Sequence, residues 1–209
     1  MKRLKLIFCL LCLCCSLTEA KEVQVDAQKE VDEMTGRLVA SYLEAKVDED
    51  VIAGYATALR SDGSFPDLDY ITVYEGSFYP AGSHLKRLKS MAIAYRKPGN
   101  KYYNSGKLLK QIVAGIDYWY KVRPKSGNWW FGDIGAPQDY MVPLILLKGK
   151  ISEKKLLHYS SYLRDLTGNK GHKGKNRTWV SAVTIHKGCI EDNIELIRIG
   201  IKSIASTIK

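Results

Sequence analysis

The chain has 209 residues, of which 45% are hydrophobic and 26% charged, and its formal net charge at pH 7 is +10. These proportions are typical of a folded protein with a hydrophobic core, and they exclude a wholly disordered chain, a collagen-like chain and a multi-span membrane protein. Four of the five cysteines lie in the first 20 residues and only Cys189 lies beyond them, which excludes a disulfide-stapled miniprotein as well.

The N-terminal segment 1–20 predicts a secretory signal peptide. A short basic start precedes an apolar run over 6–15, and Ala20 is the small residue after which cleavage is expected. The run is shorter than the ~20 apolar residues that span a bilayer. We therefore expect no transmembrane segment and a secreted or periplasmic protein. Lipidation at Cys14 or Cys15, which would leave a lipid-anchored protein, is the alternative.

The positive charge remains after this segment is removed. Cleavage takes away three basic residues and one acidic residue, and the rest of the chain keeps a net charge of +8. A basic exported protein suggests an anionic partner, such as an acidic polysaccharide, an anionic surface or a nucleic acid. A basic surface that only increases solubility is the alternative, and charge by itself does not distinguish these hypotheses.

Helical periodicity dominates the remaining sequence. Apolar residues recur at three- and four-residue steps, and turn residues separate the periodic segments. The expected helices cover 26–46, 48–60, 81–97, 104–122, 135–148, 152–165, 178–187 and 190–207. Pro137 lies near the start of its helix, where proline is tolerated.

The pattern predicts an all-α fold. No alternation typical of β-strands is sustained, although the aromatic segment 71–79 could be extended. Short connections between successive helices predict antiparallel hairpins. No linker rich in proline, glycine or serine divides the chain, so we expect one domain from about residue 22 to residue 209.

Two adjacent tryptophans, Trp129 and Trp130, mark the first candidate site in an expected loop over 123–134. Adjacent side chains cannot both point into one helical core face, and an exposed indole can stack on the apolar C–H face of a sugar. Asn128 can donate and accept hydrogen bonds to hydroxyls or a carboxylate. The alternative is that one or both tryptophans belong to the core.

The second candidate is the glycine-rich segment 167–179. It combines four Lys and Arg residues, among them Arg177, with Asn169, Asn176 and Trp179, on an expected loop that leads into a helix. Such a loop could hold a polyanion through its charges and its asparagine donors. The alternative is a solvated basic loop, and the glycine spacing is not that of a nucleotide-binding P-loop.

Other polar groups favour structural roles. Three aspartates in 62–70 could bind calcium, but they lack the full EF-hand spacing, so turn capping is favoured. The histidines are scattered and form no ligand pair at helical spacing, and we expect no metal and no cofactor. Cys189 is expected to be a small buried hydrophobe.

Three segments, taken in order, resemble polysaccharide lyase family 8, which includes the hyaluronate, chondroitin and xanthan lyases. Segment 62–70 resembles the family's "DGSW-PD-DY" stretch. Residues 128–130, followed by 133–137, resemble its "NWW…EIG-P" signature, and 167–168 through 176–179 resemble its "TGANR" segment with residues inserted. The resemblance covers essentially the whole chain after residue 20, and the chondroitin lyase branch is the nearest.

The resemblance implies an incomplete α/α toroid of antiparallel helical hairpins that forms one wall of a cleft for an acidic glycan. Trp129 and Trp130 would position sugar rings, and Asn128 would support sugar hydroxyls. Asn176 would bind and neutralise the uronate carboxylate, which acidifies the adjacent C5 proton and permits β-elimination.

Two further residues enter through the same resemblance. Arg177 would contact the acidic glycan beside Asn176. Asn169 competes with Asn176 for the carboxylate, because the inserted residues blur the alignment. Nucleic acid is not an expected partner, since the signal peptide directs export.

The resemblance also implies that catalytic groups are missing. The family's proton-transferring His and Tyr, and its catalytic Arg and Glu, are expected beyond Lys209, and His186 lies in a helix before the expected position. We therefore expect the N-terminal substrate-binding portion of a lyase, inactive alone without its C-terminal portion. A truncated product, one subunit of a split enzyme and a stand-alone, non-catalytic acidic-glycan-binding module are the open alternatives.

A toroid cut after the helix at 190–207 would leave an apolar face of that helix uncovered. This predicts partial exposure among its apolar residues Ile194, Leu196, Ile197, Ile201 and Ile204.

Overall fold

The computed structural model describes residues 26–167 and 171–207. Within these ranges the regular structure is helical and no residue is assigned to a β-strand, so the predicted all-α class is confirmed. The segment 71–79 forms bends and turns. The expected signal peptide, the cysteines within it and Asn169 lie outside the described residues.

The helices follow the predicted order. A helix that includes residues 26–43 comes first. The next elements are α2 (Glu49–Ala58), α3 (Gly82–Arg96), α4 (Gly106–Val122), the π-helical η1 (Phe131–Gly135), α5 (Ala136–Leu146), α6 (Glu153–Ser160), α7 (Gly174–Ile190) and α8 (Ile194–Ala205).

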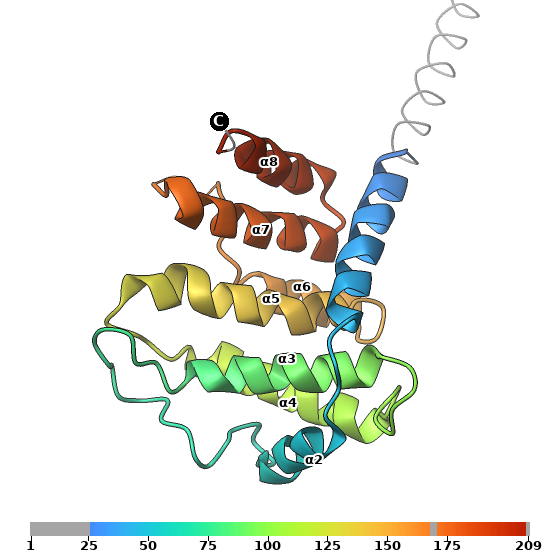
Figure 1. Cartoon of the computed structure of the whole chain (residues 1–209), viewed down its shortest axis with the longest axis vertical. Coiled ribbons are helices and arrows are strands. Elements are labelled where there is room, and N and C mark those ends of the chain that lie inside the picture. Colours follow the sequence, from blue (N-terminus) through green and yellow to red (C-terminus); the bar gives the residue numbers. More distant parts are fainter. Residues whose placement is uncertain (1–25, 168–170, 208–209) are drawn as a thin grey trace, which may run out of the picture.

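Successive helices stack as antiparallel hairpins (Figure 1). The stack is built by packing of α3 on α4, α3 on α5, α5 on α7 and α7 on α8. The helix that includes 26–43 crosses the ends of this stack, where Gln28 bonds Asp192 and the Tyr42 hydroxyl lies 2.8 Å from Nε2 of His186. The arrangement is the expected series of helical hairpins.

Helices α7 and α8 approach each other closely because two glycines face the contact. A Cβ at Gly188 would lie 2.7 Å from Cγ1 of Ile197, and one at Gly200 would lie 2.5 Å from Cγ1 of Ile185. Any larger residue would push the two helices apart.

One connected core runs through the stack. Its largest fully buried side chains come from α3, α4, α5 and α6, together with Phe65 from the chain before α3. They are Phe65, Leu85, Leu88, Met91, Leu108, Ile112, Ile116, Trp119, Tyr140, Leu144 and Tyr159. Burial of this aliphatic and aromatic surface is the main favourable contribution to folding.

Two of the three aspartates of segment 62–70 hold turns, as predicted, whereas Asp67 instead accepts two hydrogen bonds from the guanidinium of Arg87. Asp62 accepts hydrogen bonds from the backbone N–H and the hydroxyl of Ser64. Asp69 accepts bonds from the backbone N–H groups of Ile71 and Thr72. In the described residues no group of three His, Cys, Asp or Glu side chains is arranged to hold a metal ion.

Two helix starts differ from the sequence prediction. The expected loop over 123–134 is shorter, because helical backbone begins at Trp129 and continues through η1 into α5. In a regular α-helix the ring of Pro137 would clash with the carbonyl of residue 133, and the wider π-helical turn lies at this point. Helix α7 begins at Gly174 rather than at residue 178, so Asn176 and Arg177 belong to its first turn.

The boundaries around α6 and α8 also shift. Helix α6 ends at Ser160 rather than at 165. Helix α8 starts at Ile194 rather than at 190, because Asp192 adopts a positive φ of 52° and the side chain of Asn193 caps the N–H of Leu196. An isolated left-handed residue ends one helix and reverses the chain direction.

The predicted partial exposure on α8 is confirmed. Ile201 is 45% exposed, and Ile194 and Ile204 are partly buried. Leu196 and Ile197 are buried, because α7 packs closely on that side of α8. None of the helices in the described ranges is both long and apolar enough to cross a membrane.

Candidate functional site

Two of the three sequence motifs meet at one end of the stack. The segment 71–79, the chain from α4 to α5 and the start of α7 all lie on the same side of the molecule (Figure 1). Packing between η1 and α7 joins the tryptophan motif, residues 128–130, to the asparagine motif, residues 176–179. Residues more than forty positions apart in the sequence therefore form one surface.

The two tryptophans have different environments. Trp129 is 54% exposed, and one face of its indole stacks on the ring of His172 with the ring centroids 5.4 Å apart and the planes at 17°. Trp130 is half-buried and meets Trp179 edge-to-face at 5.6 Å. Trp130 and Trp179 pack on a small cluster of buried residues, Ile134, Leu166 and Val180.

The structure thus resolves the alternative left open by the sequence. Trp129 presents aromatic surface to solvent, while Trp130 serves mainly to anchor η1 on α7. Trp130 also lines, with Tyr79 and Gln138, a small cavity of about 140 Å³ between η1 and the start of α3.

Asn128 has a structural part in this surface. Its Nδ2 donates to the carbonyl of Gly76 at 2.8 Å, and its Oδ1 accepts from the N–H of Trp130 at 3.0 Å. The N–H of Gly127 donates to the carbonyl of Tyr74 at 3.0 Å. Asn128 therefore caps the helical turn of the tryptophans and ties the segment 74–76 to it.

This tie brings further aromatic rings to the same end of the molecule. Phe78 is 61% exposed and packs edge-to-face on Tyr74 at 4.9 Å. Neither Phe78 nor His172 is among the site residues predicted from the sequence. Their only sequence signals were aromatic character in a segment without periodicity and a histidine within a glycine-rich loop.

Asn176 and Arg177 lie partly buried in the first turn of α7. Unpaired backbone N–H groups give a helix N-terminus a partial positive charge that favours anions. Lys175 adds a cation there, with its Nζ 5.0 Å from the ring centroid of Trp179. Arg177 lines a cavity of about 520 Å³ together with Thr167 and residues of α8.

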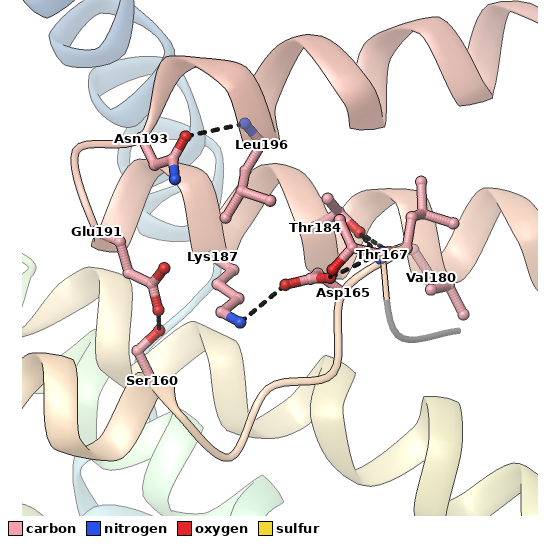
Figure 2. A network of polar contacts seen from close by, with 10 residues as sticks. Ser160, Asp165, Thr167, Val180, Thr184, Lys187, Glu191, Asn193 and Leu196 are labelled. Atoms are coloured by element: carbon pink, nitrogen blue, oxygen red, sulfur yellow. Dashed lines mark hydrogen bonds and ion pairs between the residues drawn. The ribbon is translucent and has the colours of Figure 1, made fainter. Parts of the chain in front are cut away.

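A buried polar network fixes the chain that leads toward this turn (Figure 2). Lys187 of α7 donates to Oδ2 of Asp165 at 2.8 Å, and the opposite oxygen of Asp165 accepts the backbone N–H of Thr167, also at 2.8 Å. Thr184 accepts the N–H of Leu166 at 3.0 Å. Burial would raise the pKa of Asp165, but the bonds from Lys187 and Thr167 outweigh it and hold the pKa below its usual value.

Two histidines are buried away from the surface. Nε2 of His84 donates to the carbonyl of Gly115 at 2.9 Å, so its Nδ1 accepts from the hydroxyl of Tyr70 at 3.0 Å. Nδ1 of His186 donates to the carbonyl of Ala182, and its Nε2 accepts from Tyr42. Burial lowers the pKa of each to about 4, so both rings are neutral at pH 7.

Stacked helical hairpins with an aromatic and basic surface at one end define a helical domain of the α/α-toroid class. The chain belongs to polysaccharide lyase family 8, because the pattern described as "Polysaccharide lyase family 8, N terminal alpha-helical domain" matches residues 43–209. The family expected from the three motifs is therefore confirmed.

Three curated relatives agree with this family. The chain is 29% identical over 148 residues to chondroitinase-AC of Pedobacter heparinus, a match covering 70% of this chain and 21% of that protein. It is 30% identical over 112 residues to the hyaluronate lyase HylB of Enterococcus faecalis, covering 48% of this chain and 11% of that protein. It is 27% identical over 146 residues to the xanthan lyase of a Bacillus species, and the match covers 66% of this chain and 14% of that protein. The matches span about a fifth or less of these relatives.

Solved structures show the same fold. A chondroitinase AC lyase, solved in complexes with oligosaccharides, superposes with a TM-score of 0.77 at 24% identity, covering 86% of this chain and 27% of that one. The chondroitin AC lyase of Streptomyces coelicolor A3 superposes with a TM-score of 0.70 at 16% identity, and the match covers 87% of this chain and 27% of that one. The predicted incomplete α/α toroid is thereby confirmed.

Proposed function

We propose that this chain is the substrate-binding portion of an exported polysaccharide lyase that cleaves uronate-containing acidic glycans by β-elimination. Membership of family 8 supports lyase chemistry, and the names of two relatives point to chondroitin and hyaluronate, which are glycosaminoglycans. The observation that carries the proposal is the packing of Trp130 and η1 on α7 at Trp179, one turn after Asn176.

In this proposal the glycan lies across Trp129 and reaches the start of α7. The free face of the Trp129 indole stacks on a sugar ring, while its other face stacks on the ring of His172. Asn176 donates its amide to the uronate carboxylate, and the positive end of α7 and Arg177 add to the attraction. Neutralising the carboxylate stabilises the charge that develops when the C5 proton leaves.

Asn169 remains the alternative ligand for the carboxylate, and it lies outside the described residues. Asn128 is assigned a supporting role, because both polar atoms of its side chain already bond the backbone. Trp130 is proposed to hold the site's shape and not to contact the sugar directly.

We also propose that this chain does not catalyse elimination by itself. His84 and His186 are buried with both ring nitrogens bonded, so neither of these two can abstract a proton from a glycan. His158 and His172 are the other two histidines of the chain, and the assay below tests whether either acts as a base. A stand-alone binding module for acidic glycans is therefore the second candidate, and it rests on the same surface.

Fluorescence titration with chondroitin sulfate oligosaccharides tests the binding. Trp129→Ala and Asn176→Ala should each weaken binding roughly tenfold or more, as expected for residues at the centre of a contact. Tyr103→Ala removes a similarly exposed aromatic ring from the connection between α3 and α4, a segment that lies at the other end of these helices from the α4–α5 connection (Figure 1), and it should leave binding unchanged. Equal affinity in all four proteins would sink the proposed site.

The same samples test catalysis, because an eliminated uronate absorbs ultraviolet light. We expect binding without product. Turnover by the purified chain would overturn the proposal that catalytic groups are missing.

Export is proposed from the N-terminal segment. Cleavage after Ala20 would give a protein that begins at Lys21. N-terminal sequencing of the exported protein checks this, and a lipid-modified N-terminal cysteine would instead support anchoring.

A further inference from the structure

A second polar cavity lies beside the tryptophan motif. It has a volume of about 380 Å³ and is formed by the chain after α4, by η1 and by the segment after α6. Its lining residues are Arg123, Pro124, Lys125, Ser126, Gly132, Asp133, Ser161, Tyr162 and Arg164. None of these residues is among those proposed above to contact the glycan.

The cavity carries an excess of positive charge. Arg123, Lys125 and Arg164 contribute three cations, and Asp133 is the carboxylate among the described lining residues. NH1 of Arg164 lies 3.2 Å from Oδ1 of Asp133, and its side chain is 70% exposed. Like charges gathered around one hollow repel one another, and a bound anion would relieve that repulsion.

The guanidinium of Arg123 is held in place before any ligand binds. Its Nε donates to the carbonyl of Tyr120 at 3.1 Å, and its Cζ lies 4.6 Å and 5.9 Å from the ring centroids of Tyr120 and Tyr162. Its two terminal nitrogens have no hydrogen-bond partner among the described residues. A fixed guanidinium with free N–H groups loses little entropy when it binds an oxyanion.

The hydroxyls of the cavity differ in their availability. Ser161 donates to the carbonyl of His158 and lies 2.9 Å from the hydroxyl of Tyr120, so both its donor and an acceptor position are occupied. Ser126 only accepts, from the N–H of Asn128 at 3.2 Å, so its own proton remains available. Arg123, Lys125, Arg164 and Ser126 therefore offer donors to an anion in the cavity.

The cavity is lined by residues on both sides of Trp129 in the sequence. Ser126 and Asp133 flank the tryptophan motif in sequence, and both line the hollow. Asp133 follows Trp129 by four residues in one helical stretch, which places the two side chains on neighbouring positions of the same helix face.

We propose that this cavity is an anion subsite that binds a sulfate ester or a uronate carboxylate of a glycan lying across Trp129. The inference rests on the proposed function and extends the bound length of glycan away from α7. Sulfate and carboxylate oxygens both accept the paired N–H groups of arginine, so the two groups share one recognition chemistry.

Titration calorimetry of the whole chain with sulfated chondroitin oligosaccharides, and with unsulfated chondroitin of equal length, tests the subsite. Arg164→Ala and Lys125→Ala should each weaken binding about fivefold to tenfold, as expected for one charge-assisted hydrogen bond. Asp133→Asn should strengthen binding, because it removes the negative charge from the cavity. The loss for the basic variants should shrink at high salt.

Arg37→Ala is the matched control. Arg37 is 76% exposed, pairs with Glu33 at 3.6 Å and lies on the helix 26–43, away from the cavity. Loss of binding with sulfated oligosaccharide alone identifies a sulfate ligand, and loss with both oligosaccharides identifies a carboxylate.

The two proposals fail in different ways. If the parent chain binds neither oligosaccharide, the proposed function is wrong. If the parent binds and Trp129→Ala weakens binding, but Arg164→Ala and Lys125→Ala behave like Arg37→Ala, the anion subsite is overturned while the proposed function stands.

Discussion

At the scale of single residues, two tryptophans that are adjacent in sequence have different structural roles. Trp129 and Trp130 are adjacent, yet one stacks on His172 in contact with solvent and the other packs on Trp179. The partners come from the segment before α7 and from α7 itself. The identity of the exposed tryptophan is therefore set by contacts across more than forty residues of sequence.

Gly135 makes the position of Trp130 possible. A Cβ at Gly135 would lie 2.5 Å from Cζ3 of the Trp130 ring, whereas a Cβ at Gly132 would have nothing within 4 Å. Gly135→Ala should lower the free energy of unfolding by about 1–3 kcal/mol through overpacking. Gly132→Ala should leave it unchanged or raise it by about 0.5–1 kcal/mol, because alanine favours helix. Urea unfolding measures both, and equal effects would contradict the packing assigned to Trp130.

At the scale of elements, a residue near the C-terminal end of α7 fixes the segment that leads into the start of the same helix. Lys187 lies more than three helical turns from Asn176. Its ammonium group pairs with Asp165, the residue at which the segment leading back to the start of α7 begins. The side chains of Lys187 and Asp165 are only 16% and 11% exposed. An ion pair this sheltered is costly to break on one side.

Replacing Lys187 by methionine therefore tests the network. Lys187→Met leaves Asp165 buried without its cation and should cost about 3 kcal/mol of unfolding free energy. Lys101→Met breaks the exposed pair with Glu49, at 3.5 Å, and should cost less than about 1 kcal/mol. Chemical unfolding of the two variants compares these costs. A cost for Lys187→Met no larger than that of the control would mean that the network does not fix the segment.

At the scale of the whole molecule, the stack is held by two buried neutral histidines as well as by its apolar core. His84 connects the segment 62–70 to α3 and α4, and His186 connects α7 to the helix 26–43. Protonation would place a charge inside the stack and would remove an acceptor from Tyr70 or Tyr42.

The stability should consequently fall in mildly acidic solution. The unfolded histidines take up protons near pH 6.5, while burial keeps the folded pKa values at about 4. Between these values the unfolded state binds more protons, so stability is complete above about pH 6.5 and decreases as the pH is lowered. At pH 4.5 each histidine should cost about 2–3 kcal/mol, which urea unfolding at pH 7 and pH 4.5 measures.

The aspartates do not obscure this window. The lowered pKa of Asp165 supplies stability that is present above its unfolded value of about 3.9 and is lost only below it. His186→Gln should therefore reduce the change between pH 7 and pH 4.5 by about half. A pH profile identical to that of the parent would refute the buried neutral state of His186.

The all-α class, the order of the helices and the family could be predicted from the sequence alone. These follow from local information, because apolar spacing and capping residues act within a few turns, and the motifs of 62–70 and 128–137 are contiguous. The sequence also predicted that Asp62 and Asp69 hold turns, since an aspartate side chain bonds backbone groups within a few residues of itself.

The assembly of the candidate site could not be predicted from the sequence and is known from the folded structure. The fold placed Asn176 in a helical turn, set Trp129 against His172, turned Asn128 toward the backbone of Gly76 and gathered Arg123 and Arg164 around one cavity. These outcomes depend on contacts between segments far apart in the chain. The burial and direction of a side chain follow from what packs against it, and periodicity along one segment does not contain that information.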